Sequence, residues 1–214
     1  MKYDPVKHHR RSIRLKGYDY TSAGAYFVTI CTKGRECALD DPVVAGITLD
    51  VWHALPGWFP TIELDEFVVM PNHVHLIVWL LPPDDIGEGA TRSVTPDWAG
   101  ASPSPTQWLI PQPDKVNLQP SLGDVIGAFK SLVFTVYLDW VEAHDPSRRA
   151  KFWQRNYYEH IIRSNPELNA IRRYIQENPL RWAEDRDNRN NVRHLPPPTK
   201  VEEYLEDVQV LIQE

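Results

Sequence analysis

The sequence has little cysteine and no long hydrophobic run, and each shortage excludes a class of protein. Its 214 residues include two cysteines, Cys31 and Cys37, which are too few for a disulfide framework or a four-cysteine zinc site. No apolar run approaches the roughly 18–20 residues of a membrane span, and the N-terminal stretch lacks the apolar core of a signal peptide. We therefore expect a protein of the reducing cytoplasm that does not enter a membrane.

A strong excess of one charge is also absent, yet the charges are unevenly spread. The net charge of -6 conceals two basic and two acidic blocks. Residues 1–23 hold six lysines and arginines against two acids, and residues 147–193 hold eleven against six. The overall charge therefore does not exclude a nucleic-acid partner, although a solvated surface would show the same blocks. The candidate phosphate-binding residues of the first block are Arg10, Arg11, Arg14 and Lys16.

Hydrophobic patterning predicts four strands and three helices in the order β-α-β-β-α-β-α. A short Pro71-Asn72 link favours an antiparallel hairpin of the second and third strands. Pro56, Gly57 and Pro60 are expected to end the first helix. This order predicts an α+β protein with a ferredoxin-like antiparallel sheet, helices packed on one face, and an added C-terminal helix. The strands are expected over 25–33, 62–70, 73–81 and 157–163, and the helices over 43–55, 121–144 and 166–178.

The chain is expected to form a single domain over residues 1–183. Residues 82–120 contain eight prolines and predict an extended insertion that contributes little to the core. Residues 184–214 are polar, acidic and proline-bearing, which is typical of a tail, here with a short terminal helix.

His73-Val74-His75 is the sharpest local pattern. Residues i and i+2 of a strand point to the same face, so both imidazoles can converge on one divalent cation. Such a pair leaves the site open and needs a third ligand and a substrate oxygen. Two surface or packed histidines would show the same spacing.

Tyr174 and Asn178 form a second pattern on the last predicted helix. Their spacing of four residues puts both on one face. The tyrosine offers a phenolic nucleophile and the asparagine a carbonyl oxygen for a metal. A packed aromatic residue beside a helix C-cap would look the same.

Aromatic residues alternate with arginines between Trp153 and Arg163, a composition that suits stacking and phosphate contact on a single strand. Arg155 and Arg163 are the candidate DNA contacts of this segment. An edge strand packed against the insertion is the alternative. Glu159 and His160 could neighbour a metal site, but they face opposite sides of a strand, so at most one lines it.

Three blocks together resemble a known family. They are RRSIRLKGYDYTSAGAYFVTICT, MPNHVHLI and WQRNYYEHIIRSNPELNAIRRYIQENPLRW. In this order they are similar to REP-associated tyrosine transposases, relatives of the IS200-like single-strand transposases that carry the HUH motif and one catalytic tyrosine. The resemblance covers residues 10–81 and 121–183.

The resemblance implies a metal-dependent endonuclease and strand transferase that cleaves at palindromic hairpin DNA through a 5′-phosphotyrosine intermediate. His73 and His75 would hold Mg²⁺ or Mn²⁺, Asn178 matches the third ligand, and Tyr174 matches the nucleophile. Tyr157 and Tyr158 are competing candidates, disfavoured because the family's nucleophile is helical. The partner would be single-stranded or hairpin DNA, bound by a monomer or homodimer, with the basic N-terminal block as an arm.

Two other functions share parts of this pattern. A non-catalytic nucleic-acid-binding domain of ferredoxin-like fold needs the strands and aromatics but neither His73 nor Tyr174. A metal phosphodiesterase that uses water needs the metal but forms no covalent adduct with DNA.

Overall fold

The computed structural model describes residues 15–82, 109–144, 152–197 and 205–206. They form a four-stranded antiparallel sheet in the order β2-β3-β1-β4, the order of a ferredoxin-like sheet. The predicted α+β class is confirmed. The strands are β1 (Gly24–Cys31), β2 (Ile62–Met70), β3 (His73–Leu80) and β4 (Tyr158–Ile162).

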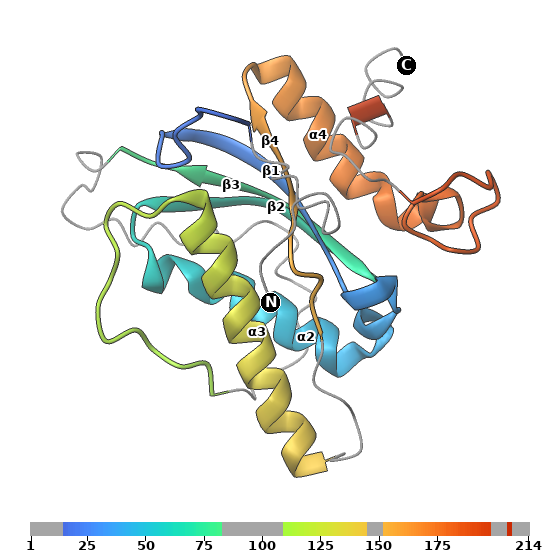
Figure 1. Cartoon of the computed structure of the whole chain (residues 1–214), viewed down its shortest axis with the longest axis horizontal. Helices are drawn as coiled ribbons and strands as arrows, with labels where there is room; N and C mark the ends of the chain where they lie inside the picture. The colour runs from blue at the N-terminus through green and yellow to red at the C-terminus, as the bar shows by residue number, and fades with distance from the viewer. Residues whose placement is uncertain (1–14, 83–108, 145–151, 198–204, 207–214) are drawn as a thin grey trace, which may run out of the picture.

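Helices cover both faces of the sheet (Figure 1). The two long helices, α2 (Pro42–Trp58) and α3 (Leu122–His144), pack on one face and bury the larger core. Helix α4 (Asn165–Glu177) covers the opposite face and buries a smaller cluster. The added C-terminal helix therefore packs on the face of the sheet that α2 and α3 leave open.

The alternation of strand residues decides which core each side chain joins. In β1, Tyr26 and Val28 belong to the core under α2 and α3, whereas Phe27 belongs to the cluster under α4. Phe27 pairs with Ile77 of β3, which lies in the same cluster. His73 and His75 share the side of Ile77, so the histidine pair faces the α4 layer.

Side-chain hydrogen bonds cap the N-termini of α3 and α4. Ser121 and Asp124 bond reciprocally at the start of α3, where the Asp124 backbone N–H donates to the Ser121 hydroxyl (3.2 Å) and the Ser121 backbone N–H donates to the Asp124 carboxylate (2.8 Å). Ser164 caps α4 by accepting from the Glu167 backbone N–H (3.3 Å). Both starts lie within a residue of their predicted positions.

The first helix was expected to stop at residue 55 under the influence of Pro56, Gly57 and Pro60, and α2 ends three residues later, at Trp58, with Pro56 inside it and Pro60 beyond it. Pro56 falls in the last turn, where proline removes a single helical hydrogen bond. The Phe59 N–H still donates to the Leu55 carbonyl (3.0 Å), so the final turn closes. The described residues also contain short 3-10 helices that the sequence did not predict, namely η1 (Lys33–Arg35), η2 (Ala38–Asp40) and η5 (Asn178–Glu184).

Several sequence expectations fall outside the described residues, among them Arg10, Arg11, Arg14, residues 83–108 of the insertion and residues 198–204 and 207–214 of the terminal tail. The described part of the insertion, 109–120, is mostly exposed and contains no helix or strand. Residues assigned to the tail behave differently, because Asp187 and Asn191 are buried. No helix among the described residues is long and apolar enough to cross a membrane.

Candidate functional site

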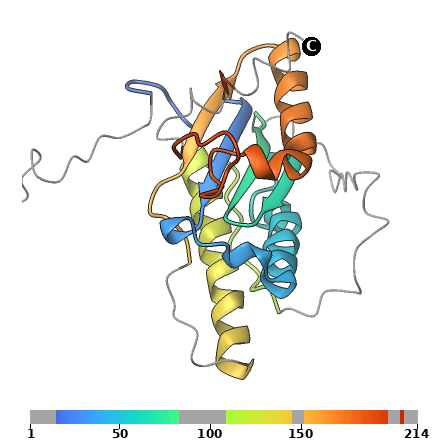
Figure 2. The same ribbon diagram turned by 90° about the vertical axis from the view of Figure 1, so that its right-hand side faces the viewer.

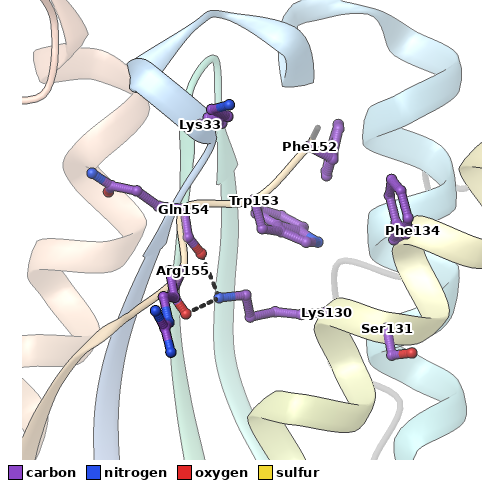
Figure 3. A pocket seen from close by; sticks show the side chains of 8 residues that line it. All are labelled: Lys33, Lys130, Ser131, Phe134, Phe152, Trp153, Gln154 and Arg155. Carbon is purple, nitrogen blue, oxygen red and sulfur yellow. Dashed lines mark hydrogen bonds between the residues drawn. The ribbon is translucent and has the colours of Figure 1, made fainter. Parts of the chain in front are cut away.

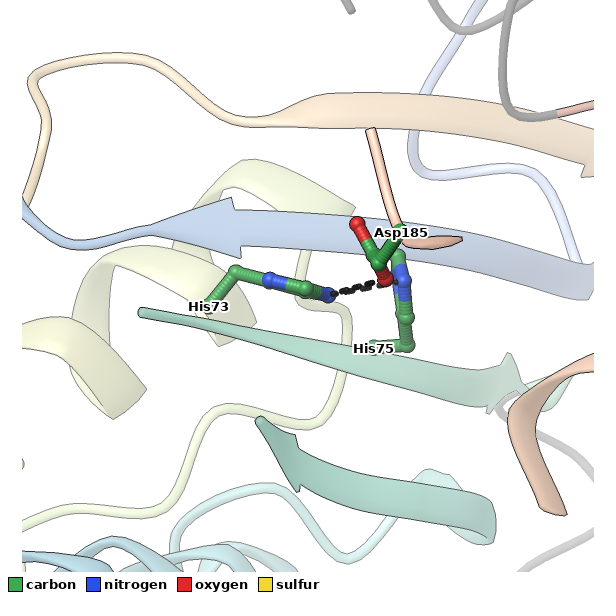
Figure 4. Close-up of side chains that lie close together, drawn as sticks. All are labelled: His73, His75 and Asp185. Carbon is green, nitrogen blue, oxygen red and sulfur yellow. Dashed lines mark hydrogen bonds and ion pairs between the residues drawn. The ribbon is translucent and has the colours of Figure 1, made fainter. Parts of the chain in front are cut away.

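His73 and His75 lie at the start of β3, one on each side of Val74 along the chain. Both are fully buried, and their Nε2 atoms are 3.0 Å apart, whereas Val74 points into the opposite core. The strand periodicity that predicted their shared face holds. Figure 4 shows the two rings converging beside Asp185.

Neighbouring side chains set the orientation of both rings. Asn72 accepts a hydrogen bond from His73 Nδ1 (2.9 Å), since its amide nitrogen already donates to the Asp187 carbonyl (2.8 Å). His73 therefore presents the lone pair of its Nε2. The Thr29 hydroxyl lies 2.8 Å from His75 Nδ1 and can donate or accept, so it tolerates either tautomer of His75. Such partners orient metal-binding histidines in general.

Both imidazoles are uncharged at neutral pH. Burial, together with the positive charge of Arg35, lowers the pKa of His73 to about 3. Burial, and the repulsion that a second proton on the neighbouring His73 would bring, hold the pKa of His75 well below its ordinary value, against an opposing effect of Asp187. Neutral imidazole is the form that binds metals, so no proton has to be displaced before binding.

Asp185 is a third candidate ligand, and the sequence analysis missed it. After α4, η5 and the residues beyond it fold back over the sheet (Figure 2). This reversal brings the Asp185 carboxylate to 3.8 Å from His73 Nε2, and the ligand atoms of Asp185, His73 and His75 all lie within 4.8 Å of one another. No local pattern marks Asp185, because its contact depends on the reversal.

Asp187 and Arg35 form a buried ion pair next to the histidines. The Asp187 side chain is completely buried and its carboxylate lies 3.8 Å from His73 Nδ1. Arg35 adopts a positive φ of 54°, an uncommon backbone conformation for a residue other than glycine. This turn directs a positive charge to the site, in a position that sequence patterns did not indicate.

Tyr174 projects from α4 towards the same histidines. It is buried, its ring packs edge-on against Phe27, and its hydroxyl lies 3.3 Å from His75 Nε2. Ile171 and Ile175 on the same helix are buried in the cluster against the sheet, which fixes the rotation of α4.

Asn178, the predicted third ligand, lies where α4 passes into η5. Its side chain is buried, and among the described residues its Oδ1 has no hydrogen-bond partner. A buried amide oxygen without a donor is uncommon in proteins and is a feature that a bound cation would satisfy. The structure therefore offers Asp185 as an oxygen ligand beside the two histidine nitrogens, and Asn178 as a second candidate whose buried oxygen has no donor among the described residues.

The competing tyrosines lie on opposite faces of the sheet. Tyr157 packs against the core under α2 and α3, away from the histidines. Tyr158 packs on the α4 side and pairs with Thr29, the neighbour of His75. Burial raises the pKa of Tyr158 against a lowering effect of the nearby Arg35. Tyr158 therefore shares the surroundings of the site, and Tyr157 does not.

The remaining candidates are dispersed. Lys16, Arg155 and Arg163 are exposed, with Arg155 before β4 and Arg163 after it. His160 is hydrogen-bonded to Glu167 of α4 (2.7 Å), and the neighbouring Glu159 is buried.

The donor set fits a divalent ion. Neighbouring ligands about 2.1 Å from an octahedral ion lie about 3.0 Å apart, which matches the separation of the two Nε2 atoms. Two imidazoles with carboxylate or amide oxygens form a mixed nitrogen and oxygen set. The oxygens suit Mg²⁺ and Mn²⁺, which favour oxygen ligands, whereas the imidazoles also suit other divalent transition metals.

Comparisons with known proteins give relatives of two kinds. No family model matches the chain. A Haemophilus influenzae protein described as uncharacterized is 35% identical over 192 residues, which span 86% of this chain and 96% of that protein.

Among solved structures, the chain is similar to a REP-associated tyrosine transposase bound to a REP hairpin, with a TM-score of 0.47 and 17% identity over 78% of this chain and 73% of the other. It is also similar to a protein described as "a putative transposase" from Deinococcus radiodurans R1, with a TM-score of 0.39 and 20% identity over 77% of this chain and 95% of the other.

Proposed function

The chain belongs to the same protein family as the Haemophilus influenzae protein with which it is 35% identical, and we propose that it is a metal-dependent single-strand DNA endonuclease and strand transferase of the REP-associated tyrosine transposase type. The proposal is supported by the three sequence blocks that resemble that family. It is supported independently by the surroundings of the histidine pair.

One observation carries the proposal. Two uncharged histidine nitrogens 3.0 Å apart, a buried carboxylate and a tyrosine hydroxyl meet in one place, although the tyrosine is 99 residues away from His75 in the chain. A nucleic-acid-binding domain has no need of this combination. A metal site beside a nucleophile is what phosphoryl transfer through a covalent intermediate requires.

The residues divide the reaction between them. His73, His75 and Asp185, with Asn178 as a further oxygen donor, would hold Mg²⁺ or Mn²⁺. When bound, the ion supplies Lewis-acid polarisation of a non-bridging phosphate oxygen. The Tyr174 oxygen forms a bond to phosphorus and loses its phenolic proton. The bond from phosphorus to the 3′ oxygen breaks, and that oxygen leaves as a 3′-hydroxyl.

The product of this step is a 5′-phosphotyrosine and a free 3′-hydroxyl end. Because the phosphodiester energy is retained in the tyrosine ester, rejoining to another 3′-hydroxyl needs no ATP. Tyr174 is buried, so the substrate has to bring a phosphate close to a side chain that exposes little surface. A single strand or the single-stranded flank of a hairpin presents a phosphate more freely than a duplex does.

The test is formation of a covalent adduct. The full chain is incubated with end-labelled hairpin DNA that carries a single-stranded flank, with Mn²⁺ or EDTA, and resolved on a denaturing gel. We expect a Mn²⁺-dependent band of protein linked to DNA. Tyr174→Phe removes one oxygen and keeps the ring, so it should eliminate the band with little change in stability.

Tyr158→Phe is the discriminating comparison, and Tyr157→Phe is the matched control on the opposite face. Both should retain the adduct. If Tyr158→Phe abolishes the adduct and Tyr174→Phe keeps it, the nucleophile is Tyr158. A nick without any adduct would favour a water-using phosphodiesterase, and DNA binding without nick or adduct would favour a non-catalytic domain.

A further inference from the structure

A hollow of about 610 Å³ opens between α3 and residues 152–155, the segment that leads into β4 (Figure 3). Its volume falls in the range of ligand pockets, about 300–1,000 Å³. It lies outside the histidine site, and we call it the α3 pocket. The side chains that matter here are three cations and three aromatics, namely Lys33, Lys130, Arg155, Phe134, Phe152 and Trp153.

The cations of the α3 pocket have no carboxylate partner among the described residues, and no acid lines the pocket. Lys130 donates to the carbonyls of Gln154 (2.6 Å) and Arg155 (3.2 Å), which uses two of its three N–H groups. Burial lowers the pKa of Lys130 to about 8. Unpaired cations gathered around a hollow attract an anion.

The aromatic side chains offer stacking surfaces and an unused donor. Phe134 and Trp153 are half-buried, so part of each ring faces the pocket, whereas Phe152 is buried and packs edge-on against Trp153 with centroids 4.5 Å apart. The Trp153 indole N–H is buried and has no acceptor among the described residues. A ligand with a flat apolar ring and polar edges would satisfy this lining.

The pocket and the histidine site flank the same end of β1. The Gln154 backbone N–H donates to the Cys31 carbonyl (2.9 Å), and Cys31 pairs with His73 across the sheet. The short helix η1 joins the two places, because Lys33 lines the pocket while Arg35, two residues on, contacts Asp187 beside His73. The histidines face α4 and the pocket lies on the side of α2 and α3, so a single strand with a phosphate at the histidines would reach the pocket by passing round the end of the sheet at η1.

We propose that the α3 pocket binds a nucleotide of single-stranded DNA next to the cleaved phosphate, with a base against Phe134 and Trp153 and a phosphate between Lys33 and Arg155. The inference rests on the proposed function, since the nucleotide belongs to the single-stranded flank of the hairpin DNA proposed as the substrate. Stacking on aromatics and contact with cations are the two general means of binding single strands.

The test measures binding without cleavage. Fluorescence anisotropy of a labelled oligothymidylate is titrated in EDTA against the full chain at several salt concentrations. Lys33→Gln with Arg155→Gln should weaken binding and reduce the log–log salt slope by about 0.7 for each lost phosphate contact. Lys115→Gln is the matched control, because Lys115 is exposed and lies outside the pocket, and it should leave the slope unchanged.

A second pair of variants tests stacking. Phe134→Leu keeps apolar bulk but removes the ring, and should weaken oligothymidylate binding about tenfold, the loss of one stacked base. Phe134→Tyr keeps the ring and should bind like the wild type. An abasic strand of equal length should bind wild type and Phe134→Leu equally.

The outcomes separate this inference from the proposed function. Unchanged affinity and slope in both the cation and Phe134 variants would overturn the α3 pocket as a nucleotide site, even if the adduct with Tyr174 forms. Weaker binding by these variants without any adduct on hairpin DNA would retain the nucleotide site and overturn the transferase. The abasic strand gives a third outcome. If Phe134→Leu weakened binding of the abasic strand as much as binding of oligothymidylate, the ring would act only through packing, which would contradict base stacking.

Discussion

Replacing Asn72 by alanine tests how the site is held together. Asn72 is 1% exposed and makes three side-chain hydrogen bonds, to His73 Nδ1 (2.9 Å), to the Asp187 carbonyl (2.8 Å) and to the Arg35 carbonyl (3.2 Å). The bonds to His73 and Asp187 are buried, whereas water can replace the part-buried bond to Arg35. Leaving a buried polar group without a partner costs about 1–3 kcal/mol. Asn72→Ala should therefore lower the free energy of unfolding by about 2–6 kcal/mol.

Urea unfolding followed by circular dichroism measures this loss. With an m-value of about 2 kcal/mol/M, the midpoint should fall by about 1–3 M. Mn²⁺ affinity, measured by calorimetry on the folded variant, should fall about 10–100-fold, because His73 loses the partner that fixes its tautomer and ring orientation.

Thr61→Val is the matched control. The Thr61 hydroxyl is buried without a hydrogen-bond partner among the described residues, so its removal breaks no bond and should leave stability unchanged or slightly higher. If Asn72→Ala were as stable as Thr61→Val, the hydrogen-bond argument would fail. If Asn72→Ala were less stable but bound Mn²⁺ as the wild type does, Asn72 would have no role in orienting a ligand.

Three further predictions address the ligand set, the docking of α4 and the basic arm. Asp185→Asn removes the anionic ligand candidate and should weaken Mn²⁺ binding at least about tenfold in calorimetry, and equal affinity would leave Asn178 as the better oxygen ligand. Burial alone would raise the pKa of Asp65, but hydrogen bonds from Arg172 and Trp79 outweigh burial and lower it. The ionised carboxylate therefore stabilises the fold above the pKa that Asp65 has in the unfolded chain, and this stabilisation is lost as the pH falls through the lower pKa of the folded state. Asp65→Asn should therefore cost about 1–2 kcal/mol at neutral pH, with a smaller difference from wild type in urea unfolding at about pH 3; a constant difference would contradict the ion pair. Removal of residues 1–16 should weaken hairpin binding and flatten its salt dependence by about 0.7–0.9 per lost phosphate contact, and an unchanged slope in a filter-binding titration would contradict the arm.

The order of strands and helices followed from the sequence because their patterns are local. Hydrophobic patterning marked the strands and helices, and the short Pro71-Asn72 link marked the β2–β3 hairpin. The predicted starts of α3 and α4 agree with the structure to within a residue. Pro56 misled because proline is a stop signal in general, but in the last turn it removes too little to end a helix.

The candidate site divides in the same way. The spacing of His73 and His75 was enough to place both imidazoles on one face of a strand, and the spacing of Tyr174 and Asn178 put both on one face of a helix. These relations depend only on strand and helix geometry over a few residues.

Only the tertiary structure decided what surrounds the two histidines. Asp185 and Asp187 come from a stretch that reads as a polar tail, and they reach His73 because the chain reverses after α4. Arg35 reaches the site through a turn with positive φ that no composition signals. The contact of Tyr174 with His75 spans 99 residues and exists because α4 packs on the face of the sheet that α2 and α3 leave open. Local periodicity fixes which way a side chain points along its own element, whereas the partners it meets are determined by how distant elements pack.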